Sequence, residues 1–277
     1  MDPATPAPED PRAQYLGPKP GEHLEKKEVS AKTMGRLQVA ADAIAETKRA
    51  IPKQGNQVVA LTSSRMNSKY RLLAMRDIGG QASFEYTTET SRRLAEENPE
   101  ADIAARADIA HGGNCGEHGF LAYHYLRLHA KGEKIAVSSS GSLDHQFTVI
   151  GDQKKEKPNE LVVADAWVNK PTACLWEDHF AYSPDLNIDY GGGVADGKSF
   201  KGAIAAGLRL TAYGKQLIQK AETEEKTKKM IEADDHTWHN EDAAADGKKY
   251  DYQSKPAATG AGATGATAGE AAGHTHE

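Results

Sequence analysis

Residues 114–130 constrain the fold more than any other segment, because they predict a helix that is apolar on nearly all sides. Asn114 is a good N-cap, Glu117 makes a capping-box-like pair with it, and Gly132 is a typical end signal. The large apolar side chains cover most of the helix circumference: Phe120, Leu121, Tyr123, Tyr125, Leu126 and Leu128. A helix with this pattern is buried, so other elements must cover it on several sides.

Strands are predicted directly after this helix, because short runs of β-forming and apolar residues follow it at 134–139, 145–150 and 161–167. The polar segment before the last run favours a hairpin. If Ile150 pairs near Glu160, then His145 lies opposite Asp165, and opposed Cβ atoms are roughly 4.5–5.5 Å apart. A slip of one residue would put Asp165 on the other face. The expected fold class is α+β, with the buried helix packed on an antiparallel sheet.

Weaker patterns predict the elements outside this centre. Before the buried helix we expect a helix from Ser30 to Pro52, strands at 58–62 and 84–88, and a helix from Asn98 to Gly112. After the strands we expect mostly loop over 170–197 and one long helix over 198–233.

Composition excludes several classes of function. The chain has 277 residues, a net charge of −6 and no basic stripe, which argues against nucleic-acid binding. No apolar run is long enough to span a membrane. The N-terminus is acidic and rich in Pro, which excludes a cleavable secretory signal peptide. Without such a signal, the cysteines are expected to be thiols in a reducing compartment.

Cys115, His145 and Asp165 are the candidate catalytic residues. Cys115 lies at the start of the buried helix, directly after a Gly-Gly-Asn turn. A helix N-terminus favours thiolate, and its backbone N–H groups can form an oxyanion hole. A thiol nucleophile also needs a base, for which His145 is placed, and an acid that orients the base, for which Asp165 is placed. We expect support at the helix start from the neighbours of the cysteine: Asn114, Gly116 and Glu117.

Each of the three candidates has a simpler interpretation. Cys115 alone could be a small buried hydrophobe, His145 a surface residue at a strand end, and Asp165 a turn or cap residue. However, an Asp in the middle of VVADAW is a poor strand former, so something should compensate its burial. The three residues together favour the catalytic interpretation.

The order of these residues resembles the papain-like fold, and most of all its compact bacterial toxin and effector members. Transglutaminase-like enzymes share the order. The resemblance covers roughly residues 110–170, about a fifth of the chain. The matching segments within it are Asn114-Cys115-Gly116-Glu117, Asp144-His145-Gln146-Phe147 and Val163-Ala164-Asp165-Ala166-Trp167. This chain has Asp-Ala-Trp where such families often have Asp-Pro-Trp, a change that should not affect the chemistry.

The resemblance implies a cysteine hydrolase that works through an acyl-enzyme and deamidates Gln or Asn side chains of a host protein. Papain-like proteolysis and transglutamination use the same intermediate and stay open, as does a non-enzymatic interaction protein with a vestigial site. The resemblance also implies secretion into a host or target cell by a specialised system without a cleaved signal peptide; otherwise the protein is cytoplasmic. We expect a monomer.

The expected organisation is a disordered segment 1–29, a single catalytic domain 30–235 with its core at about 98–215, and a disordered low-complexity tail 236–277. Both ends hold too few apolar residues to offset the entropy of ordering.

No cofactor is expected, and no metal. His118 follows Cys115 on the helix and such a pair can bind zinc, but no set of four ligands has structural-zinc spacing. The glycines 191–193 lack the strand and helix context of a phosphate loop. His236 and His239 are interpreted as surface residues, and Cys174 as structural or simply a free thiol. If the hairpin register were wrong, Asn169 would be the next candidate to orient the histidine.

Overall fold

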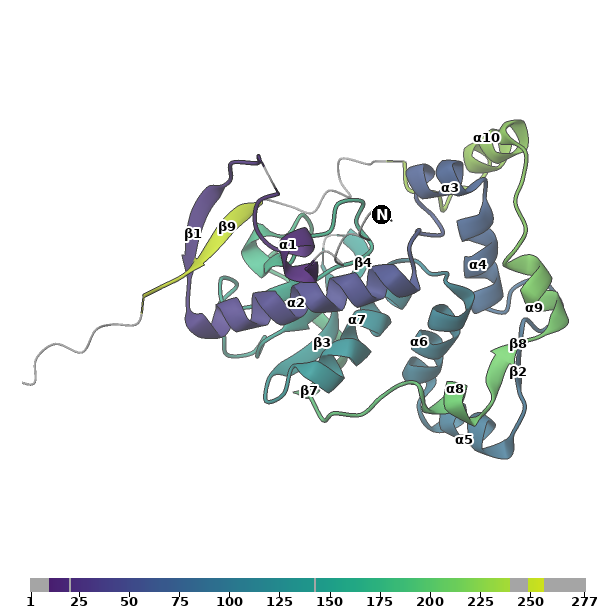
Figure 1. Ribbon diagram of the computed structural model, residues 1–277, viewed down its shortest axis with the longest axis horizontal. Helices are drawn as coiled ribbons and strands as arrows, with labels where there is room; N and C mark the ends of the chain where they lie inside the picture. Colours follow the sequence, from purple (N-terminus) through teal and green to yellow (C-terminus); the bar gives the residue numbers. More distant parts are fainter. Residues whose placement is uncertain (1–9, 20, 142, 240–248, 257–277) are drawn as a thin grey trace, which may run out of the picture.

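The computed structural model describes residues 10–19, 21–141, 143–239 and 249–256, which form a mixed α+β fold (Figure 1). Its centre is a five-stranded antiparallel sheet in the order β6-β5-β4-β3-β7. Its strands are β3 (Lys134–Ser140), β4 (Leu143–Ile150), β5 (Val162–Ala164), β6 (Cys174–Leu175) and β7 (Leu186–Val194). Two long helices, α2 (Ala31–Ala50) and α7 (Cys115–His129), pack against each other and against this sheet. The predicted α+β class, with a buried helix on an antiparallel sheet, is confirmed.

Helix α7 is buried as its apolar pattern predicts. Leu126 is 0% exposed and packs in one core with Phe147 and Val149 of β4. Full burial of a side chain of this size contributes roughly 1.5–3 kcal/mol. The hydroxyl of Thr148 on β4 donates a buried hydrogen bond to the Gly119 carbonyl of α7 at 2.7 Å. This packing fixes the start of α7 relative to strand β4.

Strands β4 and β5 form the predicted hairpin, but the predicted register is wrong. Ile150 pairs with Val162 and not near Glu160. A shift of two residues keeps every side chain on its own face of the sheet, so the error does not separate the candidate residues. The paired ladder ends at Ala164, so Asp165 directly follows β5 and does not lie within it.

Seven further helices of the described residues lie to one side of α2 and α7 (Figure 1). They are α3 (Val58–Ser64), α4 (Asn67–Met75), α5 (Glu89–Glu97), α6 (Pro99–Ala110), α8 (Gly202–Ala206), α9 (Ala212–Leu217) and α10 (Glu224–Glu232). A small antiparallel pair accompanies them, β2 (Phe84–Tyr86) with β8 (Leu208–Leu210).

Three predictions for these outer regions are wrong. The predicted strand at 58–62 is helix α3, and the predicted loop at 170–197 contains β6, the short 3₁₀ helix η1 (Trp176–Asp178) and edge strand β7. The predicted long helix over 198–233 is three short helices and a strand. Gly207, at φ 120°, ends α8, while Thr211 and Thr223 cap the starts of α9 and α10.

Segments from the two ends of the chain pair with each other. Strand β1 (Glu25–Val29) runs parallel to β9 (Tyr250–Ser254), and the short helix α1 (Pro11–Tyr15) packs on α2 (Figure 1). The prediction of disorder is therefore wrong for these segments. Each strand satisfies the other's backbone groups, and both contribute side chains to the main core. Residues 1–9, 240–248 and 257–277, where disorder was also predicted, lie outside the described residues.

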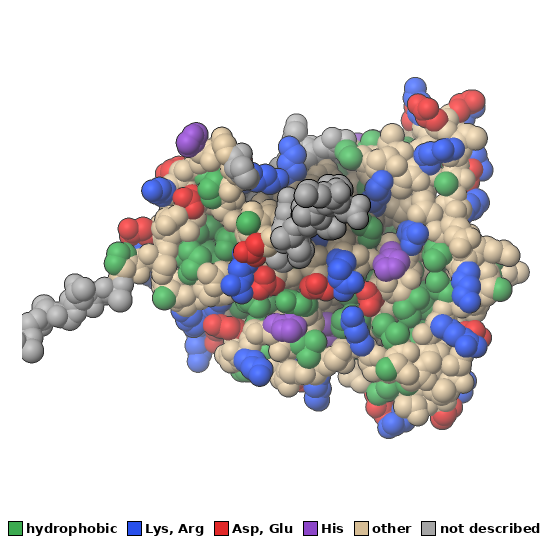
Figure 2. Space-filling view, in the orientation of Figure 1, with side chains coloured by type: hydrophobic (Ala, Val, Ile, Leu, Met, Phe, Trp, Pro, Cys, Tyr) green, Lys and Arg blue, Asp and Glu red, His purple; other side chains and the backbone are tan. Residues whose placement is uncertain are grey.

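The surface carries charges of both signs. Figure 2 shows Lys and Arg side chains interspersed with Asp and Glu over the face in front of α2. This mixture differs from the basic stripe of a nucleic-acid-binding face. Among the described residues, no helix has the length and apolar character needed to cross a bilayer.

Candidate active site

Cys115 is the first residue of α7 and is partly exposed, with its side chain against Trp167. The turn before it requires glycine, because a Cβ on Gly112 would overlap the backbone of Arg71. The first N–H groups of a helix have no intrahelical partner. The N–H groups of Cys115 and Gly116 are therefore suited to stabilising an anion beside the sulfur.

The three neighbours predicted to support the cysteine differ in role. Glu117 is 6% exposed; its carboxylate accepts the Asn114 N–H at 2.7 Å and the Nε and Nη2 hydrogens of Arg76 at 2.8 and 3.1 Å. Glu117 thus fixes the start of α7. A Cβ on Gly116 would lie 2.9 Å from Oε1 of Gln146, so glycine lets that side chain approach the helix start. The Asn114 side-chain oxygen is buried and makes no hydrogen bond within the described part of the chain.

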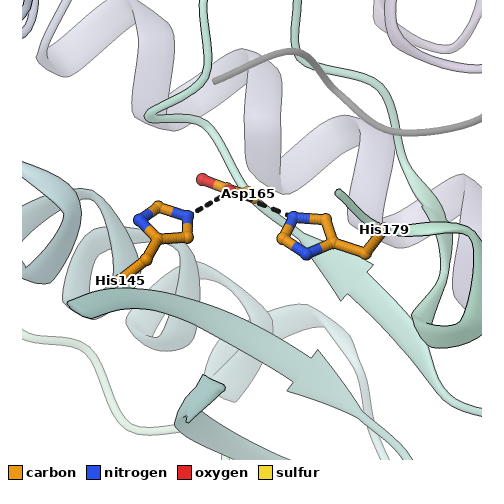
Figure 3. Close-up of side chains that lie close together, drawn as sticks. All are labelled: His145, Asp165 and His179. Atoms are coloured by element: carbon orange, nitrogen blue, oxygen red, sulfur yellow. Dashed lines mark hydrogen bonds and ion pairs between the residues drawn. The ribbon is translucent and has the colours of Figure 1, made fainter. Parts of the chain in front are cut away.

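His145 and Asp165 form a buried pair, as predicted. The imidazole Nε2 donates to Asp165 Oδ2 at 2.6 Å, and the two residues are 1% and 3% exposed (Figure 3). The other carboxylate oxygen accepts the backbone N–H of Trp167 at 3.0 Å. Asn169, the alternative partner, makes no hydrogen bond to His145 in the described residues.

The charges of this pair stabilise each other. Burial alone would lower the pKa of His145, but the Asp165 charge, the hydrogen bond to Asp165 and the neighbouring Cys115 side chain raise it to about 10. Burial alone would raise the pKa of Asp165, and the same imidazole, together with His179, holds it well below its usual range. Because Nε2 is used by Asp165, Nδ1 is the nitrogen left for proton exchange; it is buried and makes no hydrogen bond among the described residues.

A second histidine, His179, was missed by the sequence analysis. It follows helix η1, is 4% exposed, and its Nε2 lies 3.1 Å from the same oxygen, Asp165 Oδ2 (Figure 3). Its ring is nearly parallel to that of His145, at 11° and 6.2 Å between centroids. One carboxylate therefore accepts hydrogen bonds from two imidazoles.

These three side chains could also be ligands of a metal ion, since one ligand atom from each lies within 4.8 Å of the others. The hydrogen-bond partners favour a different arrangement. The backbone N–H of Ala181 donates to Nδ1 of His179 at 3.4 Å, which leaves the ring proton on Nε2. A histidine that binds a metal through Nε2 needs its proton on Nδ1, usually donated to an acceptor. The site therefore fits a hydrogen-bonded His145–Asp165–His179 chain better than a metal centre.

The connection between α2 and α3 holds the segment that follows Asp165. The side-chain amides of Gln54 and Gln57 both donate to the Trp167 carbonyl, that of Gln57 at 2.9 Å. Asn56 accepts the Trp167 indole N–H at 3.1 Å. The indole lies 4.8 Å from the His145 ring, between centroids. Residues 54–57 thus position the aspartate and cover the histidine, a role that the sequence did not indicate.

His118 is buried, and its contacts do not form a zinc site with other described residues. Its Nδ1 donates to the Asn114 carbonyl at 2.6 Å, and burial together with the nearby Lys48 ammonium lowers its pKa to about 4. Burial also lowers the pKa of Lys48 to about 8, against the opposing effect of the Asp165 charge. His118 does not join the three-residue cluster among the described residues. Cys115 and Cys174 are both thiols.

A polar pocket of about 560 Å³ opens beside the pair and is lined by His145, Gln146, Asp144 and Asp189, among others. Asp189 accepts the side-chain amide of Gln146 at 2.9 Å, so this wall is ordered. A larger pocket, about 710 Å³, lies between α3 and α10, apart from the cluster. Of these two pockets, the polar one includes His145 in its lining, and Cys115 is not among its lining residues.

Comparisons with known proteins identify no relative. No family model matches the chain, and no curated protein and no solved structure is significantly similar to it.

Proposed function

We propose that the protein is a cysteine hydrolase in which Cys115 is the nucleophile, His145 the general base and Asp165 the residue that orients the base. The observation that carries the proposal is the position of His145. It donates to Asp165 at 2.6 Å through Nε2, its Nδ1 is buried without a hydrogen-bond partner among the described residues, and the Cys115 side chain lies close enough to raise its pKa. A buried carboxylate, an imidazole and a thiol at a helix start are the groups that this chemistry needs.

The proposed reaction proceeds through an acyl-enzyme. His145 holds the Cys115 proton, and the thiolate attacks an amide carbon, so that a C–S bond forms and the C–N bond breaks. His145 returns the proton to the leaving nitrogen. Water, deprotonated by His145, then cleaves the thioester and yields a carboxylic acid. The N–H groups at the start of α7 would stabilise the oxyanion.

Within this class we propose that the protein deamidates Gln or Asn side chains of another protein. The first candidate substrates are proteins of a host cell. The support is the resemblance to compact effectors and the polar character of the pocket beside His145, which suits an amide better than an apolar group. Proteolysis releases an amine in place of ammonia, and transglutamination uses an amine in place of water. These alternatives share every catalytic step up to the acyl-enzyme.

The test compares wild type with Cys115→Ala in host-cell lysate. Ammonia release with Gln→Glu or Asn→Asp mass shifts of about 1 Da in a substrate protein supports deamidation. New termini indicate proteolysis, and cross-linked products indicate transglutamination. Each signal must be absent in Cys115→Ala.

The alternative, a non-enzymatic interaction protein, is distinguished by the reactivity of the two thiols. A functional triad makes iodoacetamide label Cys115 much faster than the buried Cys174. Equal labelling of the two thiols, with no turnover in several lysates, would contradict the enzyme proposal and favour the interaction protein.

A further inference from the structure

We propose that His179 is a positioning residue of the catalytic site: a neutral imidazole that donates to Asp165 and holds its carboxylate in the orientation that His145 requires. This inference rests on the proposed cysteine hydrolase. It adds a fourth residue, from a part of the chain that the sequence analysis did not connect with the site.

The hydrogen bond between His179 and Asp165 has a defined direction. The N–H of Ala181 points to Nδ1 of His179 at 3.4 Å, so Nδ1 accepts and Nε2 carries the proton. The Nε2–H then donates to Asp165 Oδ2 at 3.1 Å. A backbone group fixes the tautomer, and the histidine acts as a donor without needing a positive charge.

The hydrogen bond from His179 helps to fix the orientation of the Asp165 carboxylate. Asp165 Oδ2 accepts from His145 and His179, while Oδ1 accepts from the Trp167 backbone. Figure 3 shows the two imidazoles approaching the carboxylate from different sides. Together with the Trp167 N–H, they define both the position and the rotation of the carboxylate plane. Without His179, the carboxylate loses one of its three donors, and one lone pair of Asp165 Oδ2 is left buried without a hydrogen bond.

Packing against aromatic side chains holds His179 itself in place. Its ring packs against Trp176, Phe180 and Phe147 at centroid distances of 5.9, 4.7 and 4.8 Å. The preceding residue, Asp178, accepts the Tyr252 hydroxyl at 2.8 Å. A side chain fixed on both sides can orient a partner, which a mobile one cannot.

Other charged and titratable groups also face Asp165. Besides the two histidines, Lys48 of α2 and His118 of α7 act on it electrostatically, and Cys115 acts on His145. A hydrogen bond to the ionised form lowers the pKa of Asp165, and His179 contributes in that direction. Loss of His179 should therefore shift protonation of Asp165 to higher pH, while the groups named here stay in place.

The experiment measures the rate of iodoacetamide labelling at Cys115 as a function of pH, by peptide mass spectrometry, and needs no known substrate. His179→Phe keeps a ring but has no donor, and His179→Gln supplies an N–H at similar reach. His124→Phe is the matched control, because His124 is a fully buried histidine of α7 outside the site. The melting temperature is recorded for every variant.

We expect His179→Phe to lower the labelling rate at neutral pH on the order of tenfold to a hundredfold, the scale of a hydrogen bond to a charged group. The acid side of its pH profile should move to higher pH. His179→Gln should recover most of both effects, and His124→Phe should behave as wild type. If His179→Phe does not fold, His179→Asn replaces it, because its shorter amide stops short of Asp165.

Three results would overturn the proposal. If Cys115 of His179→Phe is labelled at the wild-type rate, His179 has no positioning role. Equal losses in His179→Phe and His179→Gln, with an unmoved acid limb, indicate packing alone. A chelator that reduces the wild-type rate to that of His179→Phe indicates a metal centre. Failure of the proposed function looks different, because wild-type Cys115 is then labelled no faster than Cys174.

Discussion

Replacement of Asp165 by Asn tests the proposed catalytic pair of His145 and Asp165 most directly, because it changes charge and hydrogen bonding with little change in shape. Asp165 accepts three hydrogen bonds, from His145 at 2.6 Å, from His179 at 3.1 Å and from the Trp167 N–H at 3.0 Å. An amide has only one acceptor oxygen. Whichever way Asn is rotated, its NH₂ group faces a donor, either the Trp167 backbone or the two imidazoles.

The expected magnitude follows from the bonds that are lost. If the amide oxygen stays on the Trp167 N–H, both imidazoles lose an ionised acceptor. Hydrogen bonds to charged groups contribute roughly 1.5–3 kcal/mol each, so two of them correspond to a rate loss on the order of 10²–10⁴. The equivalent change in a serine triad costs about 10⁴. The pKa of His145 should fall as well, because the Asp165 charge is a principal cause of its rise to about 10.

The assay is the second-order rate of Cys115 alkylation, followed by turnover once a substrate is known. Asp152→Asn is the control, because Asp152 is a half-buried aspartate outside the site that also accepts a charged donor, Lys134, at 2.9 Å. A rate for Asp165→Asn within threefold of wild type would refute the assignment. So would losses that simply multiply in the double variant with His145→Ala, since residues that act as a unit do not lose activity independently.

Three further predictions follow from other contacts. Cys115→Ala should abolish activity and leave the melting temperature nearly unchanged, because it removes only a sulfhydryl at a partly exposed site; residual activity in pure protein would contradict this. Tyr252→Phe should cost roughly 1–3 kcal/mol in urea unfolding, since it leaves the buried Leu175 N–H without its acceptor; Tyr182→Phe, at an exposed position, should cost nothing. The raised pKa of His145 means that the ionised pair stabilises the fold fully below about pH 6.5 and loses this contribution as pH rises toward 10. The stability difference between wild type and His145→Gln should therefore shrink over that range, and a constant difference would show that the pair does not titrate as inferred.

The sequence predicted the parts of the site that depend on local signals. Asn114 and Glu117 mark the start of α7, so the place of Cys115 in the fold follows from short-range rules. The alternating pattern predicted β4 and the start of β5. The hairpin register was two residues wrong, yet His145 and Asp165 still meet, because an even shift preserves the face of each side chain.

The missed residues depend on contacts between distant segments. His179 follows a two-residue strand and a single 3₁₀ turn, and neither leaves a periodic pattern in the sequence. Gln54 and Gln57 act through their amides on one backbone carbonyl, a contact that no residue pattern specifies. The prediction of one long helix over 198–233 was wrong for another reason. The many helix-forming residues in this segment outweighed, in the sequence pattern, the stop signal at Gly207.

The paired chain ends connect these observations with the site. Lys27 of β1 donates to both Glu177 and Asp178, at 2.6 and 2.7 Å, and Tyr252 of β9 bonds Asp178 and the Leu175 backbone. Both strands therefore act on the turn that directly precedes His179. Their side chains are mostly polar and charged, so neither strand would be stable alone; each depends on the other and on this turn. Segments that composition assigns to disordered ends thus support the carboxylate at the centre of the molecule, through one histidine.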